Sequence, residues 1–347
     1  MAERPPLRLA RTAVLEIEVD EGGPRDGRPI LLLHGWPDAP RGWRGVAERL
    51  QQRGWRTFVP ALRGSGATRF HSPTTPRDGR GVALAADAID LLDVLGLDRV
   101  AVVGHDWGAR AAYTLAAIAP ERVRAIVALA LPYQPRGEFA IPPFGQAHAF
   151  WYQWLMYLDA GVRAIEADPI AFARIQWDTW SPPGWFDEDE FDATAQSFRN
   201  PDWVAITLHA YRSRFLPDEP RDSRYDRVAQ RLAAVESLDV PTLMIQGADD
   251  RCDEPLFEEL QVAPTFVRVA PGPAWHATAA GNEILALTTA PDALPAGVVA
   301  RKLNPRRTLA FELLVRDEIP SPALAAFIEL AAAADRPAAN RTLAAVA

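Results

Sequence analysis

The fold is determined around one stretch, Val100-Ala101-Val102-Val103-Gly104-His105-Asp106-Trp107-Gly108-Ala109. Its first part is a continuous apolar run, which predicts a strand buried on both faces of a sheet. From Ala109 to residue 118 the apolar residues follow a helical period, so a helix is predicted there. Asp106 would then lie at a sharp strand-turn-helix junction, with its side chain projecting over the edge of the sheet. Gly104 and Gly108 would let the strand and the helix pass closely.

The rest of the chain repeats this alternation of strand and helix on both sides of the junction. Strands are predicted at residues 12–19, 29–33, 57–60, 123–131 and 241–246, and helices at 42–52 and 81–95. The alternation predicts parallel βαβ units, and hence an α/β fold with a mostly parallel, doubly wound sheet. A chain of 347 residues, 48% of them hydrophobic, is long enough for one such domain with a large insertion.

The alternation is interrupted between Pro132 and Leu238 by a stretch rich in proline and aromatic residues. Six of the eleven tryptophans lie in it: Trp151, Trp154, Trp177, Trp180, Trp185 and Trp203. We interpret it as a helical lid inserted between two strands, over the carboxyl ends where open α/β sheets bind ligands. A helical subdomain with no role in binding is the alternative. The predicted organisation is a core at 1–133 and 236–276, a lid at 134–235 and a C-terminal extension at 277–347.

The residue type at the junction predicts the reaction class. A carboxylate with a pKa of about 4 is already ionised at neutral pH and needs no base to activate it. It is a weak nucleophile toward esters and amides, because the adduct expels it again, but it can displace a leaving group at an sp³ carbon. Asp106 is therefore predicted to form a covalent aspartyl ester. The alternative is that Asp106 only caps the following helix.

A second motif, His34-Gly35-Trp36-Pro37-Asp38, follows a buried strand and is expected to pass near the junction. The backbone N–H groups of Trp36 and Trp107 are predicted to form an oxyanion hole. The indoles of Trp36, Trp107 and Trp154 are predicted to bind substrate. Pro37 is a candidate for a cis peptide bond.

Together with Leu62-Arg63-Gly64-Ser65-Gly66, these motifs resemble the epoxide hydrolase branch of the α/β-hydrolase superfamily over roughly residues 12–276. Haloalkane dehalogenases usually carry Asn at the place of Trp36, and fluoroacetate dehalogenases usually carry Arg at the place of Trp107. Both differences favour the epoxide hydrolase branch.

The resemblance implies the remaining machinery. Asp250 matches the acid that orients the base, with Asp249 as the alternative, and His276, after the strand-like run at 266–269, matches the base that activates water. Tyr152 and Tyr211 match the two lid tyrosines, whose hydroxyls would donate hydrogen bonds to the epoxide oxygen. Beyond His276 the sequence departs from the family and faintly resembles the C-terminal end of LysR-type effector-binding domains.

Composition excludes several other classes. A net charge of −8 and a pI near 5.4 argue against a nucleic-acid partner. The single cysteine, Cys252, permits neither an internal disulfide nor a zinc-ligand cluster. The chain starts without the basic and apolar run of a secretory signal and has no uninterrupted apolar stretch of about 18 residues, so a cytoplasmic protein that does not enter a membrane is expected. The sequence leaves a homodimer open.

The expected function is the cofactor-independent, metal-free hydrolysis of small apolar epoxides to vicinal diols, with water as the second reactant. The alternatives are a haloalkane dehalogenase that uses the same Asp106 and a catalytically impaired binding or sensor protein with a hydrolase fold.

Overall fold

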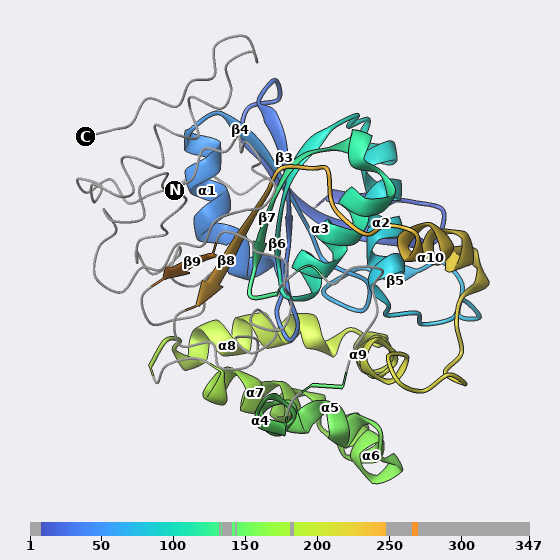
Figure 1. Cartoon of the computed structure of the whole chain (residues 1–347). Coiled ribbons are helices and arrows are strands. Elements are labelled where there is room, and N and C mark those ends of the chain that lie inside the picture. The colour runs from blue at the N-terminus through green and yellow to red at the C-terminus, as the bar shows by residue number, and fades with distance from the viewer. Residues whose placement is uncertain are drawn as a thin grey trace.

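A mostly parallel sheet runs through the middle of the molecule (Figure 1). The computed structural model describes residues 8–131, 133, 141–142, 144–180, 184–247 and 266–269. The strand order within them is β1-β2-β4-β3-β6-β7-β8-β9, and β5 pairs with β2. The strands are β1 (Arg8–Arg11), β2 (Leu15–Gly22), β3 (Arg28–Leu33), β4 (Trp55–Pro60), β5 (Arg69–Phe70), β6 (Val100–His105), β7 (Val123–Leu129), β8 (Thr242–Gly247) and β9 (Phe266–Val269). Pairing is antiparallel for β2 with β1, β4 and β5, and parallel from β4 across to β9.

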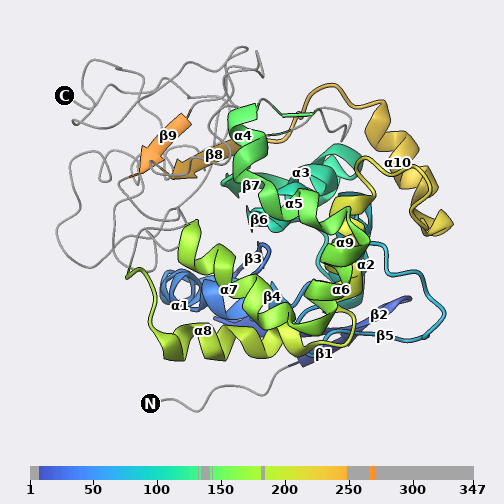
Figure 2. The same cartoon turned by 90° about the horizontal axis from the view of Figure 1, so that it is seen from below.

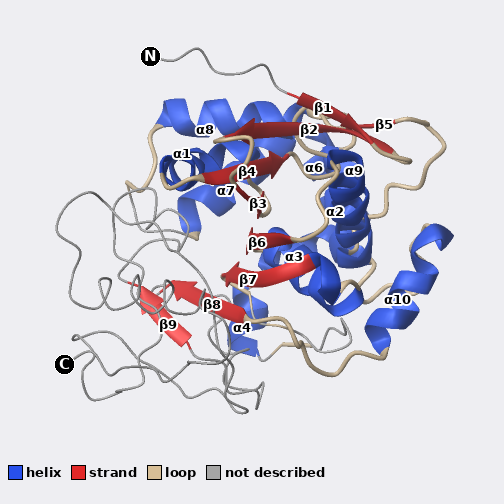
Figure 3. Ribbon diagram, turned by 90° about the horizontal axis from the view of Figure 1, so that it is seen from above, coloured by secondary structure: helices blue, strands red, loops and turns tan. Residues whose placement is uncertain are grey.

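Helices cover both faces of the sheet. Figure 1 shows α1 (Arg44–Gln52) on one side and α2 (Gly81–Leu95) with α3 (Trp107–Ile118) on the other. The chain moves from β3 to β4 in one direction along the sheet and then back past β3 to β6, as the strand order in Figure 3 shows. Because parallel crossovers are right-handed, this reversal puts α1 and α2 on opposite faces. The predicted doubly wound α/β fold is confirmed.

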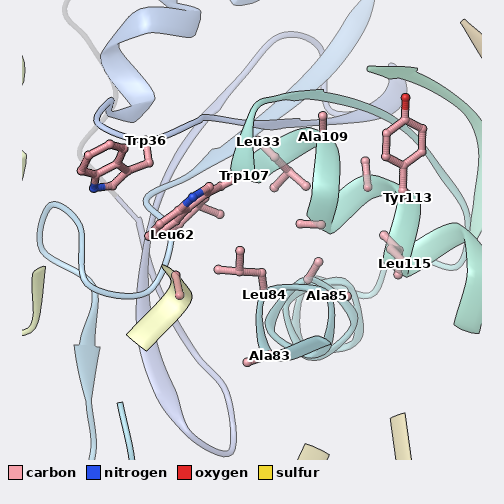
Figure 4. Close-up of a cluster of buried hydrophobic side chains, with 14 of the residues drawn as sticks. Leu33, Trp36, Leu62, Ala83, Leu84, Ala85, Trp107, Ala109, Tyr113 and Leu115 are labelled. Carbon is pink, nitrogen blue, oxygen red and sulfur yellow. The ribbon is translucent and has the colours of Figure 1, made fainter. Parts of the chain in front are cut away.

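The core beside β3 and β6 is built around small residues on α3. Ala109 and Ala111 are fully buried, which lets α3 pack closely on the sheet and on α2. Figure 4 shows Leu33 of β3 and Ala109 of α3 near Leu84 of α2. The packing of α3 on the sheet and on α2 fixes the position of the β6–α3 junction.

The bounds of the five strands predicted at 12–19, 29–33, 57–60, 123–131 and 241–246 are shifted by one to three residues in the structure, and for two of these strands a local cause is visible. β2 begins at Leu15 rather than at residue 12, because the Thr12 hydroxyl accepts hydrogen bonds from the N–H groups of Val14 and Leu15 and makes a turn. β7 ends at Leu129 rather than at residue 131, because Ala130 has a φ of 68° and leaves the strand.

A helical insertion separates β7 from β8, as predicted. It contains α4 (Phe144–Ala149), α5 (Trp151–Met156), α6 (Asp159–Ala167), α7 (Pro169–Thr179), α8 (Glu188–Ala195), α9 (Trp203–Arg212) and α10 (Asp226–Ala233). Asp168 and Asp187 cap α7 and α8 by accepting hydrogen bonds from Ala171 N–H and Glu190 N–H. Seen from below in Figure 2, α4 to α9 lie in front of the sheet. In contrast, α10 packs on α2 and α3.

Short 3-10 helices lie at Pro40–Trp43, Pro120–Arg122, Gln196–Arg199 and Ser223–Tyr225. In the part of the chain that the structure describes, no helix combines the length and the hydropathy needed to cross a membrane.

Candidate active site

The junction between β6 and α3 has the strained geometry that the sequence predicts. Asp106 has φ 50° and ψ −112°, in a region that few residues other than glycine adopt. Close approach explains the flanking glycines. A Cβ on Gly104 would lie 2.2 Å from the Gly108 carbonyl oxygen, and one on Gly108 would lie 2.1 Å from the Leu33 carbonyl oxygen. Neither position can therefore carry a side chain.

The loop after β3 brings backbone donors to the Asp106 carboxylate. Trp36 N–H donates to Asp106 Oδ1 at 2.8 Å, and Trp107 N–H also forms a hydrogen bond with the carboxylate. Apart from this bond from Trp107, the first residue of α3, the side chain of Asp106 makes no N-cap hydrogen bond to the helix. Gly35 permits this approach, because a Cβ there would lie 2.8 Å from Asp106 Cβ. The Trp36–Pro37 peptide bond is cis.

His34, buried in the loop after β3, supports two loops rather than facing the site as a base. Leu62 N–H donates to His34 Nε2 at 3.1 Å, and His34 Nδ1 lies 2.8 Å from the Gly35 carbonyl oxygen, so the neutral ring ties the loop after β3 to the loop after β4. Burial lowers the pKa of His34 to about 4. Burial, together with the nearby His34, lowers the pKa of His105 to about 3.

Opposing effects set the ionisation of Asp106. Burial raises its pKa, because a charged carboxylate loses its hydration. Hydrogen bonds from Trp36 and Trp107 N–H and the charges of Arg110 and Arg214 act in the opposite direction, but the pKa remains above its ordinary value. Asp106 is thus a desolvated carboxylate held by backbone donors.

Two tyrosines from separate helices of the insertion meet above the carboxylate. Tyr152 of α5 and Tyr211 of α9 have ring centroids 5.6 Å apart at an angle of 88°, and their hydroxyls are hydrogen-bonded to each other. Gln153 Nε2 donates to the Tyr152 hydroxyl at 2.9 Å, and Trp107 Nε1 donates to the Tyr211 hydroxyl at 3.3 Å. Burial is the main cause that raises the pKa of both phenols. The negative charge of Asp106 is next for Tyr211, and for Tyr152 it comes after the effect of Tyr211, so both are neutral donors.

The Trp36 side chain lies at the centre of an aromatic cluster over the junction. Rings from the insertion and from α3 surround it with centroids 5.3 to 6.1 Å away: Tyr211, Tyr152, Phe172, Trp180, Trp107 and Trp203. Its Nε1 donates to Thr207 Oγ1 on α9 at 2.9 Å, and only 4% of the residue is exposed. Figure 4 shows the indoles of Trp36 and Trp107 close together. The insertion therefore covers the ends of β3 and β6 with aromatic rings.

The structure brings five of the predicted site residues together: Asp106, Trp36, Trp107, Tyr152 and Tyr211. It places Trp154 in another group of rings, against Tyr157 and Phe215, with its Nε1 donating to the Ala147 carbonyl oxygen. Asp249, Asp250 and His276 lie outside the described residues. No group of three or more His, Cys, Asp or Glu side chains within the described ranges could hold a metal ion.

Sequence reasoning missed three residues of the site: Gln153, Trp180 and Arg214. Helical spacing could have indicated Arg214, because it lies three residues after Tyr211, nearly one turn further along α9 and its continuation. Trp180 carries no such signal, since it reaches Tyr152 only through the packing of α7 against its neighbours.

Comparison with known proteins identifies the fold family. Residues 28–261 match the family model of the alpha/beta hydrolase fold. Epoxide hydrolase 3 of Siraitia grosvenorii is 39% identical over 116 residues, which are 33% of this chain and 36% of that protein. Epoxide hydrolase A of Mycobacterium tuberculosis is 31% identical over 189 residues, 52% of this chain and 56% of that protein. The chain thus spans between a third and just over half of the length of these two curated relatives.

Among solved structures, a Klebsiella pneumoniae protein provisionally assigned as an epoxide hydrolase superposes with a TM-score of 0.71 at 35% identity. The superposition covers 78% of this chain and 91% of that one. The family model matches two thirds of the chain, so the chain belongs to the alpha/beta hydrolase fold family. Within that family it is similar to epoxide hydrolases.

Proposed function

We propose that the protein hydrolyses small apolar epoxides to vicinal diols through an ester on Asp106. The observation that carries this proposal is the pair of hydrogen-bonded phenols, Tyr152 and Tyr211, held over a carboxylate that two backbone N–H groups bind. A nucleophile on one side and two neutral donors on the other are what the opening of an epoxide requires.

In the first step, an Asp106 carboxylate oxygen attacks one epoxide carbon. A C–O bond to Asp106 forms while the C–O bond of the ring breaks, and its electron pair moves onto the departing oxygen. Tyr152 and Tyr211 stabilise that oxygen by hydrogen bonds, and one of them supplies the proton. The product is a hydroxyalkyl ester of Asp106.

In the second step, water attacks the ester carbonyl carbon, and the assigned base, His276 oriented by Asp250, takes its proton. The N–H groups of Trp36 and Trp107 stabilise the negative charge on the former Asp106 oxygen in the tetrahedral adduct. The adduct then expels the alkoxide of the product, which takes the proton back from the imidazolium. Asp106 is regenerated with one oxygen from water. The water proton left on this carboxyl group returns to the phenolate formed in the first step after the ester is cleaved, and the diol leaves.

The contacts of Trp107 favour this reaction over dehalogenation. A halide leaving group needs N–H donors and no phenol. Here Trp107 Nε1 donates to the Tyr211 hydroxyl at 3.3 Å, and Tyr211 contacts the Trp36 ring. A carbon–halogen substrate would leave the tyrosine pair without a role.

Isotope labelling tests the proposal directly. The native chain is incubated with styrene oxide in water enriched in heavy oxygen, and the peptide that contains Asp106 is analysed by mass spectrometry. Hydrolysis of an aspartyl ester is expected to place the heavy isotope in the Asp106 carboxylate over several turnovers. Asp106→Asn should form no diol, and Tyr152→Phe should lower the rate of ester formation by roughly 100-fold.

A short bromoalkane serves as the competing substrate in the same assay. Diol formation without label in the Asp106 peptide would exclude the ester mechanism. Label with the bromoalkane alone would assign the dehalogenase reaction instead, and absence of product and of label with a panel of both substrates would indicate a binding protein.

A further inference from the structure

Arg214 is placed where one side chain reaches both tyrosines. Its guanidinium carbon lies 4.4 Å from the centre of the Tyr211 ring, a distance at which a cation is attracted to an aromatic face. Its Nη1 donates to Gln153 Oε1 at 3.1 Å, and Gln153 Nε2 donates to the Tyr152 hydroxyl at 2.9 Å. A continuous chain of contacts therefore runs from Arg214 to each phenol.

The chemistry of these groups determines the direction of the hydrogen bonds. Arginine carries only donors, so Arg214 selects the oxygen end of the Gln153 amide. The NH₂ end must then face Tyr152, whose oxygen accepts from it. Gln153 is only 4% exposed, so solvent water cannot replace these two hydrogen-bond partners of its amide group. The proton of Tyr152 is consequently directed away from Gln153, toward the space it shares with the Tyr211 hydroxyl.

We propose that Arg214 is a positioning residue that, through Gln153, directs the Tyr152 hydroxyl proton toward the epoxide oxygen. This inference rests on the proposed function, in which that oxygen lies between the two phenols. Without Arg214, the Gln153 amide can rotate by half a turn and present its oxygen to Tyr152. The phenol would then donate to Gln153 instead of to the substrate.

Electrostatics supports the same role. Burial raises the pKa of both Tyr152 and Tyr211, and the charge of Arg214 opposes this rise in each. A phenol with a lower pKa is a stronger donor to a developing alkoxide. The charge also lowers the pKa of Asp106, which keeps the nucleophile ionised.

Three variants separate orientation from charge. Arg214→Met removes both the donor and the charge, whereas Arg214→Lys keeps a charge and a donor. Gln153→Glu keeps the contact with Arg214 but offers Tyr152 only acceptor oxygens. Arg174→Met is the matched control, because Arg174 pairs with Asp178 and Glu188 at the surface of the insertion.

The rate of ester formation on Asp106 is measured with styrene oxide by rapid acid quench and intact mass. Arg214→Met and Gln153→Glu are each expected to slow it about tenfold, the effect of one misdirected hydrogen bond. Arg214→Lys should fall between Arg214→Met and the native chain, and Arg174→Met should match the native chain. Hydrolysis of the ester should proceed at the native rate in every variant, because the second step does not use Tyr152. A purely structural role would slow both steps.

Binding of phenylacetamide, by calorimetry, gives a readout that needs no reaction. Its carbonyl oxygen accepts hydrogen bonds from the phenols, so Arg214→Met should weaken binding about tenfold. Native rates and affinities in Arg214→Met and Gln153→Glu would overturn the inference and leave the proposed function standing. Affinity that depends on Arg214 in a chain that forms no ester would support the positioning of the Tyr152 hydroxyl by Arg214, but it would overturn the proposed function and, with it, the epoxide oxygen as the acceptor. Neither ester nor binding in the native chain would overturn both.

Discussion

At Asp106, burial and hydrogen bonding oppose each other, and burial prevails. The pKa of this carboxyl is raised by desolvation, although two backbone N–H groups and two arginines lower it. Only the ionised form can attack an epoxide. As the proposed nucleophile, Asp106 would therefore attack without a full hydration shell, and its rate would decline with acid at a higher pH than for an exposed aspartate.

The rate of ester formation should consequently fall on acidification with a midpoint above about 4, the value for an ordinary aspartate. Rapid-quench measurements of the adduct over a pH series would give this midpoint, with circular dichroism to check that the chain stays folded. Tyr152→Phe should lower the rate at every pH and keep the decline. A midpoint at or below the ordinary value would contradict the burial argument.

The Trp36 side chain is expected to limit the size of the substrate, because its ring occupies the centre of the aromatic cluster. Trp36→Phe should admit bulkier epoxides, because the smaller ring leaves room for one or two additional methylene groups of the substrate. The ratio of kcat/KM for a disubstituted epoxide to kcat/KM for styrene oxide should rise roughly tenfold. Thr207→Val is the control, since it removes the bond to Trp36 Nε1 and leaves the ring. Equal substrate ratios in Trp36→Phe and in the native chain would show that the indole does not limit the pocket.

Among the elements, the loop after β4 is tied to α2 and to the end of the insertion by one arginine. Arg63 is fully buried and donates two hydrogen bonds to Asp87 of α2, at 2.7 and 2.6 Å. It also donates to the Tyr225 hydroxyl and to the Asp78 carbonyl oxygen. These contacts fix the Leu62–Gly66 motif, whose first residue donates its N–H to His34.

Arg63→Met should lower the free energy of unfolding by about 3–5 kcal/mol, because it leaves Asp87 buried without its cation. The double variant Arg63→Met with Asp87→Leu should recover most of this loss, since it removes both charges. Urea unfolding measures each. Arg174→Met, whose ion pairs are exposed, should cost less than about 1 kcal/mol. A double variant as unstable as Arg63→Met would show that the hydrogen bonds to Tyr225 and Asp78, and not the ion pair, carry the stability.

The elements also show what a sequence can predict. The helix at 81–95 and the strand at 266–269 have their predicted bounds, because apolar periodicity marks both. β1 and β5 were missed. β5 has two residues, and β1 has one buried residue among exposed ones, so neither carries a pattern. The junction at Asp106 could be predicted because Gly104 and Gly108 stand where the strand and the helix pass too closely for a side chain. Trp180 could not, because three-dimensional packing of the insertion alone brings it to Tyr152.

On the scale of the whole molecule, two neutral histidines with lowered pKa values, the buried His34 and the half-buried His105, make the fold sensitive to acid. The pKa of His34 is lowered to about 4 and that of His105 to about 3, whereas an unfolded chain titrates histidine near 6.5. From about pH 6.5 down to about pH 4 for His34, and down to about pH 3 for His105, the unfolded chain therefore binds protons that the folded chain does not. The contribution of these histidines to stability is present above this window and is lost as the pH falls through it.

Each histidine should then lower the free energy of unfolding by up to about 1.4 kcal/mol per pH unit within that window. Urea unfolding at a series of pH values would measure the slope. His34→Asn should make it shallower, whereas His148→Asn, at an exposed position of α4, should leave it as in the native chain. An unchanged slope in His34→Asn would assign the acid sensitivity to other groups.

Trp36 performs two separate tasks with two separate parts. Its backbone N–H binds the Asp106 carboxylate, and its indole fills the space below Tyr152 and Tyr211. The backbone group is present whichever side chain stands there, apart from proline. Selectivity at this position could thus diverge between related proteins, or be altered in a library of variants, without removing the N–H donor that the proposed reaction uses. If the proposed reaction holds, position 36 is where substitutions should change substrate selectivity with little loss of rate.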